Sequence, residues 1–155
     1  MKVIQAMPNM PSPVTEAEVE KFLESKLNIQ LATIDEQGYP NVQPVWFLYE
    51  NGRLYTGTQR TTKKVQNIRK NPDKIYFSID DENFPYKGVK GRGVATISED
   101  VQKNLQVVEK INLKYLGTPE HPLAKMLTDN TRNGTEVVIE ITPKFFSAWD
   151  FSKAM

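Results

Sequence analysis

Residues 31–58, LATIDEQGYPNVQPVWFLYENGRLYTGT, decide the expected fold. Apolar and β-branched residues come in short runs, and the turn sequences DEQG and NG separate these runs. The dipeptide NG is a strong hairpin signal, because a tight two-residue turn needs positive φ at both central positions. We therefore predict strands at 29–35 and 41–50, and a hairpin partner of the second strand at 53–58.

Pro44 lies inside the second of these strands. Proline cannot donate a hydrogen bond to a strand ladder, so the strand must lie at a sheet edge or be bulged at this point. The interruption frees backbone N–H and C=O groups to face a ligand, with Trp46, Phe47 and Tyr49 close by. For Phe47 taken alone, the alternative is an ordinary core position.

The rest of the chain adds helices and strands by hydrophobic periodicity. Thr15 and Glu18 match a capping box, and Gly117 is typical of a helix end. The strands follow one another mostly as hairpins, which favours a mainly β fold over a parallel sheet: a small antiparallel barrel with peripheral α-helices. We expect one domain over 1–155, with an irregular arm at 1–13, helices at 15–25, 61–71, 99–117 and 121–130, and further strands at 74–80, 88–98, 135–141 and 144–151.

The composition excludes several kinds of chemistry. The chain has 155 residues, a formal net charge of +1 and no cysteine, which excludes disulfides, thiolate nucleophiles and cysteine-ligated metals. A single histidine, His121, leaves little for a zinc site or a Ser-His-Asp triad, so we expect no metal. No apolar run has membrane-spanning length and the start lacks a signal-peptide core, so a soluble cytoplasmic protein without a membrane partner is expected.

Residues 60–72, RTTKKVQNIRKNP, carry five cations and no acid. Lys63 and Lys64 fall in the first turn of the expected helix, where the positive end of the helix dipole makes cations unfavourable. A bound anion would remove this cost, and helix N-termini are ready-made phosphate sites. The alternative is a solvated basic helix face. The groups expected around the anion are the hydroxyls of Thr58, Thr61 and Thr62, the guanidinium of Arg60, and the two lysines.

A third feature is the sequence GVKGRGV, in which Gly91 and Gly93 share one face of a strand. Two such glycines indicate that something packs close to the backbone. A flat ligand, a helix and another subunit are all compatible with this pattern. So is a simple bend in the barrel.

In this order and spacing, these segments resemble the pyridoxamine 5′-phosphate oxidase-like family of flavin-binding split barrels. Residues 31–58 are similar to its opening hairpins, and TTKKVQNIRKNP is similar to its phosphate-binding turn and helix. GVKGRGVATI and IEITPKFFSAWDF are similar to its later strands. The resemblance covers the chain from Leu31 onward, and it implies a split antiparallel barrel and an oxidoreductase. It further implies a homodimer with two FMN sites at the subunit interface.

The resemblance also implies roles for individual residues. The backbone of one segment would hold the isoalloxazine edge, and the end of the next strand with its turn would hold the ribityl phosphate. Residues 86–90 and the C-terminal tryptophan of the other subunit would complete the site. The isoalloxazine set is Val45, Trp46 and Phe47; the phosphate set is Tyr55, Thr56, Thr58, Thr62, Lys63 and Lys64; the partner-subunit set includes Lys87, Lys90 and Trp149.

The chain departs from the true oxidase at its end, FFSAWDFSKAM, which has neither the arginine nor the histidine of that enzyme's substrate motif. We therefore do not expect vitamin B6 oxidation, and the substrate stays unknown. The flavin would perform the redox step, with Lys87, Lys90 or Arg92 as a candidate cation near the ring. Alternatives are the deazaflavin F420 in place of FMN, a non-catalytic flavin or haem carrier, with haem depending on His121, and nucleic-acid binding through 60–70. The near-neutral net charge makes the last the least favoured, so no nucleic-acid partner is expected.

Overall fold

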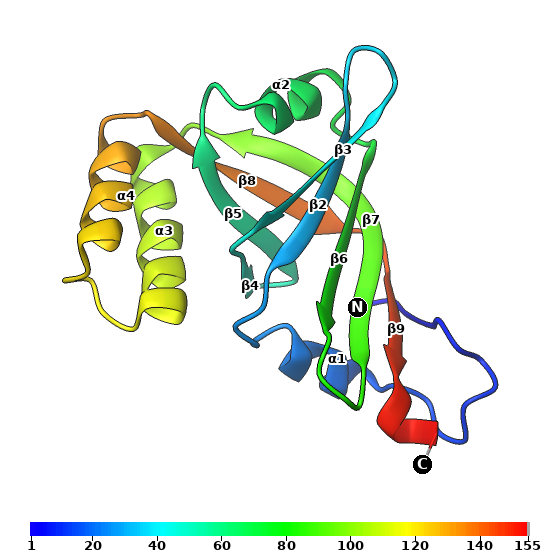
Figure 1. Ribbon diagram of the computed structural model, residues 1–155. Coiled ribbons are helices and arrows are strands. Elements are labelled where there is room, and N and C mark those ends of the chain that lie inside the picture. The colour runs from blue at the N-terminus through cyan, green and yellow to red at the C-terminus, as the bar shows by residue number, and fades with distance from the viewer. Residues whose placement is uncertain (155) are drawn as a thin grey trace.

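The computed structural model describes residues 1–154 and shows one mostly antiparallel, nine-stranded sheet with four α-helices around it (Figure 1). The mainly β fold with peripheral helices is confirmed. The strands are β1 (Val3–Gln5), β2 (Ile29–Ile34), β3 (Pro40–Val45), β4 (Leu48–Glu50), β5 (Arg53–Gln59), β6 (Ile75–Asp81), β7 (Lys87–Ser98), β8 (Glu136–Pro143) and β9 (Phe146–Asp150). The helices are α1 (Glu16–Phe22), α2 (Lys63–Lys70), α3 (Val101–Leu116) and α4 (Pro122–Arg132), with a final 3₁₀ turn, η1 (Phe151–Ala154).

The sheet follows the order β3-β2-β6-β7-β8-β5-β4, and it is not closed. β3 and β4 stand at its two ends, which places Pro44 in an edge strand as the sequence predicts. α2 lies at one end of the sheet, α1 lies near the other, and α3 and α4 stand together beside β5 (Figure 1). The curved sheet is therefore open between its two edge strands, β3 and β4. Of the two mouths of the curved sheet, one lies next to α2 and the other next to α1 (Figure 1).

β7 is the longest strand; it pairs with β6 along one edge and with two further strands along the other. Its first residues, Lys87–Lys90, pair with β9, and its last, Gly93–Ser98, pair with β8. A Cβ atom on Gly91 would lie under 3.0 Å from the carbonyl oxygen of Phe145, between β8 and β9, and one on Gly93 would lie under 3.0 Å from that of Thr142 in β8. These two glycines therefore make room for the chain's own backbone where the partner of β7 changes from β9 to β8.

Two sequence expectations are wrong in detail. The arm at 1–13 is not wholly irregular, because β1 pairs in parallel with β9. The expected strand at 41–50 is broken at Trp46 and Phe47 into β3 and β4, and only β4 pairs with β5. The break arises because contacts with α3, rather than a strand partner, hold the backbone of Phe47.

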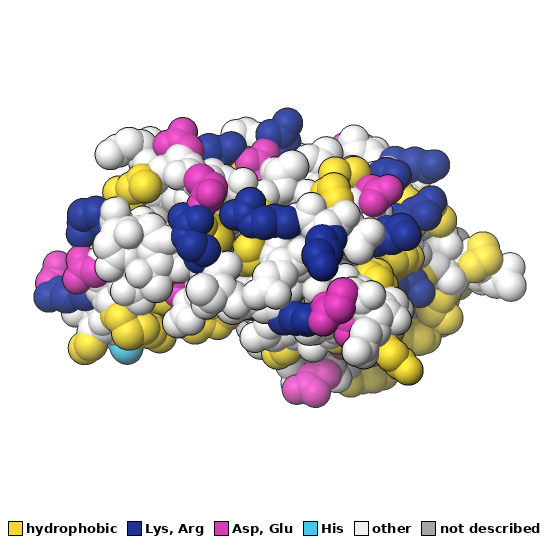
Figure 2. All heavy atoms as spheres, turned by 90° about the horizontal axis from the view of Figure 1, so that it is seen from above, with side chains coloured by type: hydrophobic (Ala, Val, Ile, Leu, Met, Phe, Trp, Pro, Cys, Tyr) yellow, Lys and Arg dark blue, Asp and Glu magenta, His cyan; other side chains and the backbone are white. Residues whose placement is uncertain are grey.

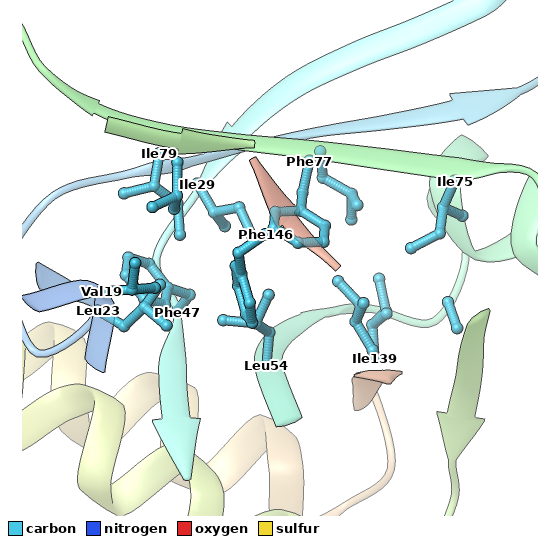
Figure 3. Packing of buried hydrophobic residues seen from close by; sticks show 14 of the residues in the cluster. Val19, Leu23, Ile29, Phe47, Leu54, Ile75, Phe77, Ile79, Ile139 and Phe146 are labelled. Atoms are coloured by element: carbon cyan, nitrogen blue, oxygen red, sulfur yellow. The ribbon is translucent and has the colours of Figure 1, made fainter. Parts of the chain in front are cut away.

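The main core lies inside the curved sheet (Figure 3). The rings of Phe77 and Phe146 meet edge to face with centroids 5.6 Å apart, and Phe47 lies beside Val19 of α1 and Leu23, which follows that helix (Figure 3). A second cluster lies between the outer face of the sheet and α3; it consists of Tyr55, Val107, Val108, Ile111, Tyr115 and Val138. Side chains alternate along a strand, so Leu54 of β5 faces the main core while Tyr55 faces α3.

Local signals place the helices where the sequence predicts. The capping box of Thr15 and Glu18 is present at α1, and Gly117 ends α3 in the left-handed region with φ 77°. Asn51 and Gly52 both have positive φ in the β4–β5 hairpin, as the NG signal requires. No helix within residues 1–154 is long and apolar enough to cross a membrane.

Candidate functional site

The junction between β5 and α2 leaves the start of the helix uncapped. Thr62 occupies the N-cap position, but its hydroxyl donates to the Gln59 carbonyl at 3.0 Å and lies 3.3 Å from the Thr58 hydroxyl. It makes no capping bond to the first-turn N–H groups, and the first turn contains no acid. The positive end of α2 therefore keeps its donors available for an anion.

Acids from distant parts of the chain approach this basic segment. Lys63 Nζ lies 2.6 Å from Glu36 in the β2–β3 turn, and Arg60 and Arg69 both pair with Glu99 after β7. The hydrogen bond from Lys63 lowers the pKa of Glu36. Figure 2, which views the molecule from the α2 end, accordingly shows lysine and arginine side chains with acids among them. These pairs are exposed, and exposed ion pairs are weak enough for an incoming anion to displace.

Lys64 behaves differently because it is buried, with 5% of its surface exposed. Its Nζ donates to Gln43 Oε1 on β3 at 3.0 Å. Burial lowers the pKa of Lys64, and the nearby Glu136 of β8 opposes this shift. Burial likewise raises the pKa of Glu136, and Lys64 opposes that shift. A buried cation thus lies next to the edge strand β3, where the sheet is open.

Contacts with α3 fix the segment between β3 and β4. The N–H of Phe47 donates to the Tyr115 hydroxyl at 3.2 Å, and Lys114 Nζ donates to the Phe47 carbonyl at 2.9 Å. The ring of Trp46 stacks on that of Tyr115, with centroids 4.7 Å apart and 3° between the planes. The backbone N–H and C=O of Trp46 form no hydrogen bond with residues 1–154. Between β3 and β4, the backbone of Trp46 is thus unpaired among the described residues, whereas the backbone of the next residue, Phe47, is hydrogen-bonded at both its N–H and its C=O.

Lys114 and Tyr115 are site residues that the sequence interpretation missed. Burial lowers the pKa of Lys114 to about 8 and raises that of Tyr115 to about 12. Lys114 stands three residues after Ile111, on the inward side of α3. The signal in the sequence that could have indicated this site is a lysine at an inward position of an amphipathic helix.

The two predicted sets of one subunit are linked only through neighbouring residues. Lys64 bonds to Gln43, two residues before Val45, and Trp46 lines a small cavity of about 50 Å³ with Gly57, which lies between Thr56 and Thr58 on β5. Thr56 and Thr58 share the inner face of β5 with Leu54, whereas the side chain of Tyr55 points to α3. Thr61 is exposed, and Arg60 Nε also donates to the Gly134 carbonyl at 3.0 Å.

The predicted partner-subunit residues do not join this group within one chain. Lys87 and Trp149 line a cavity of about 440 Å³ between α1 and the strands β7 and β9, near the end of the sheet away from α2 (Figure 1). Lys90 is exposed on β7. The indole N–H of Trp149 is buried and has no hydrogen-bond partner in the described part of the chain.

His121 is the N-cap of α4, where its Nδ1 accepts a hydrogen bond from the Leu123 N–H at 3.0 Å. Its role within this chain is therefore to cap the helix. No group of three or more histidine, aspartate or glutamate side chains in residues 1–154 is arranged to hold a metal ion.

The open antiparallel sheet, with an uncapped strand-to-helix junction beside a broken edge strand, defines a class of protein. The family model described as pyridoxamine 5′-phosphate oxidase matches residues 15–150. This chain therefore belongs to the pyridoxamine 5′-phosphate oxidase family, and its sheet is of the split-barrel type found in that family.

Individual relatives differ in what their names say they bind. Haem oxygenase HutZ of Vibrio cholerae serotype O1 is 30% identical over 106 residues, or 64% of this chain and 60% of that protein, so less than two thirds of the relative is matched. A conserved hypothetical protein of Mycobacterium tuberculosis is 26% identical, with TM-score 0.80 and coverage of 96% of this chain and 91% of that one. A solved F420 reductase is 29% identical, with TM-score 0.67 and coverage of 83% and 94%.

Proposed function

We propose that this chain binds FMN and acts as a flavin-dependent oxidoreductase on a small molecule. One observation carries the proposal: α2 begins directly after β5 with no acid and no side-chain cap in its first turn, and Lys63 and Lys64 occupy that turn. Helix N-termini of this kind bind phosphate through free N–H groups and the helix dipole. FMN ends in such a phosphate.

The residues present fit the phosphate. The hydroxyls of Thr58 and Thr62 lie at the helix start, and Lys63 has only an exposed ion pair to give up. Lys64 is a buried cation whose pKa burial lowers, and a nearby anion would oppose that shift and stabilise its charged form. The unpaired backbone of Trp46 supplies a donor and an acceptor for the polar edge of the flavin ring.

When bound, FMN supplies the redox chemistry, so the protein needs no acid–base pair of its own. The protein's part is to hold the phosphate at α2, to orient the ring against residues 45–47, and to exclude water from it. The chain ends in FFSAWDFSKAM, without arginine or histidine. We therefore propose a substrate other than pyridoxamine phosphate.

We further propose a cytoplasmic homodimer in which Lys87, Lys90 and Trp149 of one subunit complete the site of the other. The support is their position: Lys87 and Trp149 line a cavity near the end of the sheet away from α2, so they cannot serve the same subunit's phosphate site.

F420 is the second candidate cofactor. The observation in its favour is the 29% identity to an F420 reductase over 94% of that chain. The phosphate site alone does not discriminate, because F420 also carries a phosphate beside its ring. Its longer acidic tail would require further cations, for which Arg60 and Lys64 are the candidates.

A haem carrier is the third candidate, suggested by the similarity to a haem oxygenase. His121 is the single histidine, and it caps α4 rather than joining residues 45–47 and 56–64. Replacement of His121 by alanine should remove only the cap, at a cost of about 1 kcal/mol. Haem titration of this variant, followed at the Soret band, should match that of the wild type. Loss of haem binding in the variant alone would favour the haem carrier.

The test of the main proposal is the visible spectrum of the purified protein, with mass spectrometry of what heat releases, followed by titration with FMN and with F420. A yellow protein that releases FMN, or that binds FMN more tightly than F420, supports FMN. If F420 binds more tightly than FMN, F420 is the cofactor of this site. Binding of neither refutes the flavin proposal.

A further inference from the structure

Both backbone polar groups of Phe47 are bound by two consecutive residues of α3. Lys114 donates to its carbonyl at 2.9 Å, and the hydroxyl of Tyr115 accepts from its N–H at 3.2 Å. The same hydroxyl donates to the carbonyl of Leu27 at 2.5 Å, so Tyr115 ties the segment to the chain before β2 as well. The peptide plane of Phe47 is therefore fixed from both sides.

Lys114 is a cation without a counter-ion. It forms no ion pair with any carboxylate in residues 1–154, and its ammonium lies 3.7 Å from the centre of the Phe47 ring and 5.0 Å from that of Tyr115. Burial is the cause that lowers its pKa, which at about 8 still leaves it charged at neutral pH. A half-buried charge with only a carbonyl and two aromatic faces as partners costs stability. Such groups concentrate at functional sites.

The neighbour that Lys114 and Tyr115 support is the unpaired backbone of Trp46. The indole ring of Trp46 is stacked on Tyr115, so this residue also has little freedom to turn. Its N–H and C=O are held in a defined direction without any protein partner. Helix α3 thus orients a free donor and acceptor on the residue next to the one it binds.

We propose that Lys114 is a positioning residue for the cofactor: it acts through the Phe47 carbonyl to orient the Trp46 backbone toward the polar edge of the flavin ring, and its charge favours negative charge on that ring. Tyr115 assists as the second support of Phe47. This inference rests on the proposed flavin site. The inference assigns a role to Lys114, which lies outside the sequence motifs that suggested the site.

The test compares Lys114→Met with Lys110→Met in the full chain. Met keeps the length of the side chain but removes the charge, and Lys110 is an exposed residue one turn earlier on α3, paired with Glu50 at 2.8 Å. Each variant is titrated with FMN by fluorescence quenching at several pH values, and the midpoint potential of the bound FMN is measured. Circular dichroism establishes that each variant is folded.

We expect Lys114→Met to weaken FMN binding roughly tenfold at pH 7, as for one charge-assisted hydrogen bond, and to make the midpoint potential more negative. Lys110→Met should change neither. Wild-type affinity should fall as the pH rises through about 8, where Lys114 loses its proton, and this step should be absent from Lys114→Met. Tyr115 is the titratable group that faces Lys114, and it stays neutral there because its pKa is raised to about 12.

The outcomes separate this inference from the function on which it rests. Wild-type protein that binds neither FMN nor F420 overturns both. Wild-type binding that Lys114→Met leaves unchanged, in affinity, pH profile and potential, overturns the role of Lys114 alone. Should Lys114→Met fail to fold, Lys114→Gln takes its place, because it keeps a donor for the Phe47 carbonyl without the charge; the same loss of the pH step is expected.

Discussion

Glu36 and Lys63 form an ion pair, with 2.6 Å between carboxylate and ammonium, that joins the β2–β3 turn to the first residue of α2. The carboxylate thus reaches the first turn of α2, which contains no acid of its own. A phosphate bound at this turn would place its negative charge near the same lysine. The β2–β3 turn and the phosphate would therefore compete for Lys63.

Removal of this acid should strengthen phosphate binding. Glu36→Gln frees Lys63 and removes a negative charge near the site, so we expect FMN to bind about two- to fivefold more tightly at low salt, with the gain shrinking as salt rises. Isothermal titration at two salt concentrations measures this. Glu20→Gln removes an exposed acid of α1 and serves as the control. Equal affinities for the two variants would contradict phosphate binding at Lys63.

The lysines of the first turn should contribute to FMN affinity. The double variant Lys63→Ala, Lys64→Ala should lose roughly 1.5–3 kcal/mol of FMN binding energy for each phosphate contact removed. Thermal unfolding should change little for Lys63→Ala because Lys63 is exposed, whereas Lys64→Ala also removes the hydrogen bond of this buried lysine to Gln43, so circular dichroism first establishes that the double variant is folded. Lys70→Ala, at the other end of α2, is the matched control. An unchanged flavin affinity in the double variant would refute the phosphate assignment.

Lys114 should give the unliganded protein a distinct pH dependence. Its folded pKa of about 8 lies below the unfolded value of 10.5, so between these pH values the unfolded chain binds more protons and the free energy of unfolding rises with pH. Other groups titrate in this range too, so the difference between wild type and Lys114→Met isolates the lysine. Urea unfolding from pH 7 to pH 10 should show a smaller rise in the variant. If the free energy of unfolding rose equally with pH in wild type and variant, the pKa of Lys114 would not be lowered in the folded state.

Gly91 of β7 and Gly57 of β5 should respond very differently to substitution by alanine. Gly91→Ala places a methyl group under 3.0 Å from the Phe145 carbonyl, and backbone at that corner cannot yield cheaply. We expect a loss of about 3 kcal/mol or more in the free energy of unfolding. Gly57→Ala, also in a strand, meets Val108 at an ordinary 3.6 Å and should change stability little. Chemical denaturation of both variants provides the comparison.

Most of the fold was predictable because its signals are local. The NG turn, the capping box at Thr15 and the helical spacing on either side of Ile111 each act within a few residues, and each element appears where its signal lies. The sequence did not predict β1 because this strand has only three residues, too few to show a periodic pattern, and a proline-rich stretch follows it. Its partner, β9, lies at the opposite end of the sequence.

The candidate site was predictable in part, for the same reason. The α2 start is a local motif, and Pro44 marked the edge strand correctly. The acids that reach Lys63 and Arg60 come from other turns, and no short window of sequence contains both partners. Lys114 bonds to a carbonyl 67 positions earlier in the chain, which only the packing of α3 on the sheet brings near.

The parallel pair of β1 and β9 has a consequence for how the chain folds. Val3 pairs with Phe146 and Gln5 with Ala148, so this pair closes a loop of almost the whole chain and no turn nucleates it. Such distant contacts form late, after the strands between them are in place. With only three residue pairs, it is also a unit expected to open on its own while β9 stays attached to β7. Backbone amides near Val3 should therefore exchange with solvent well before those of the central strands.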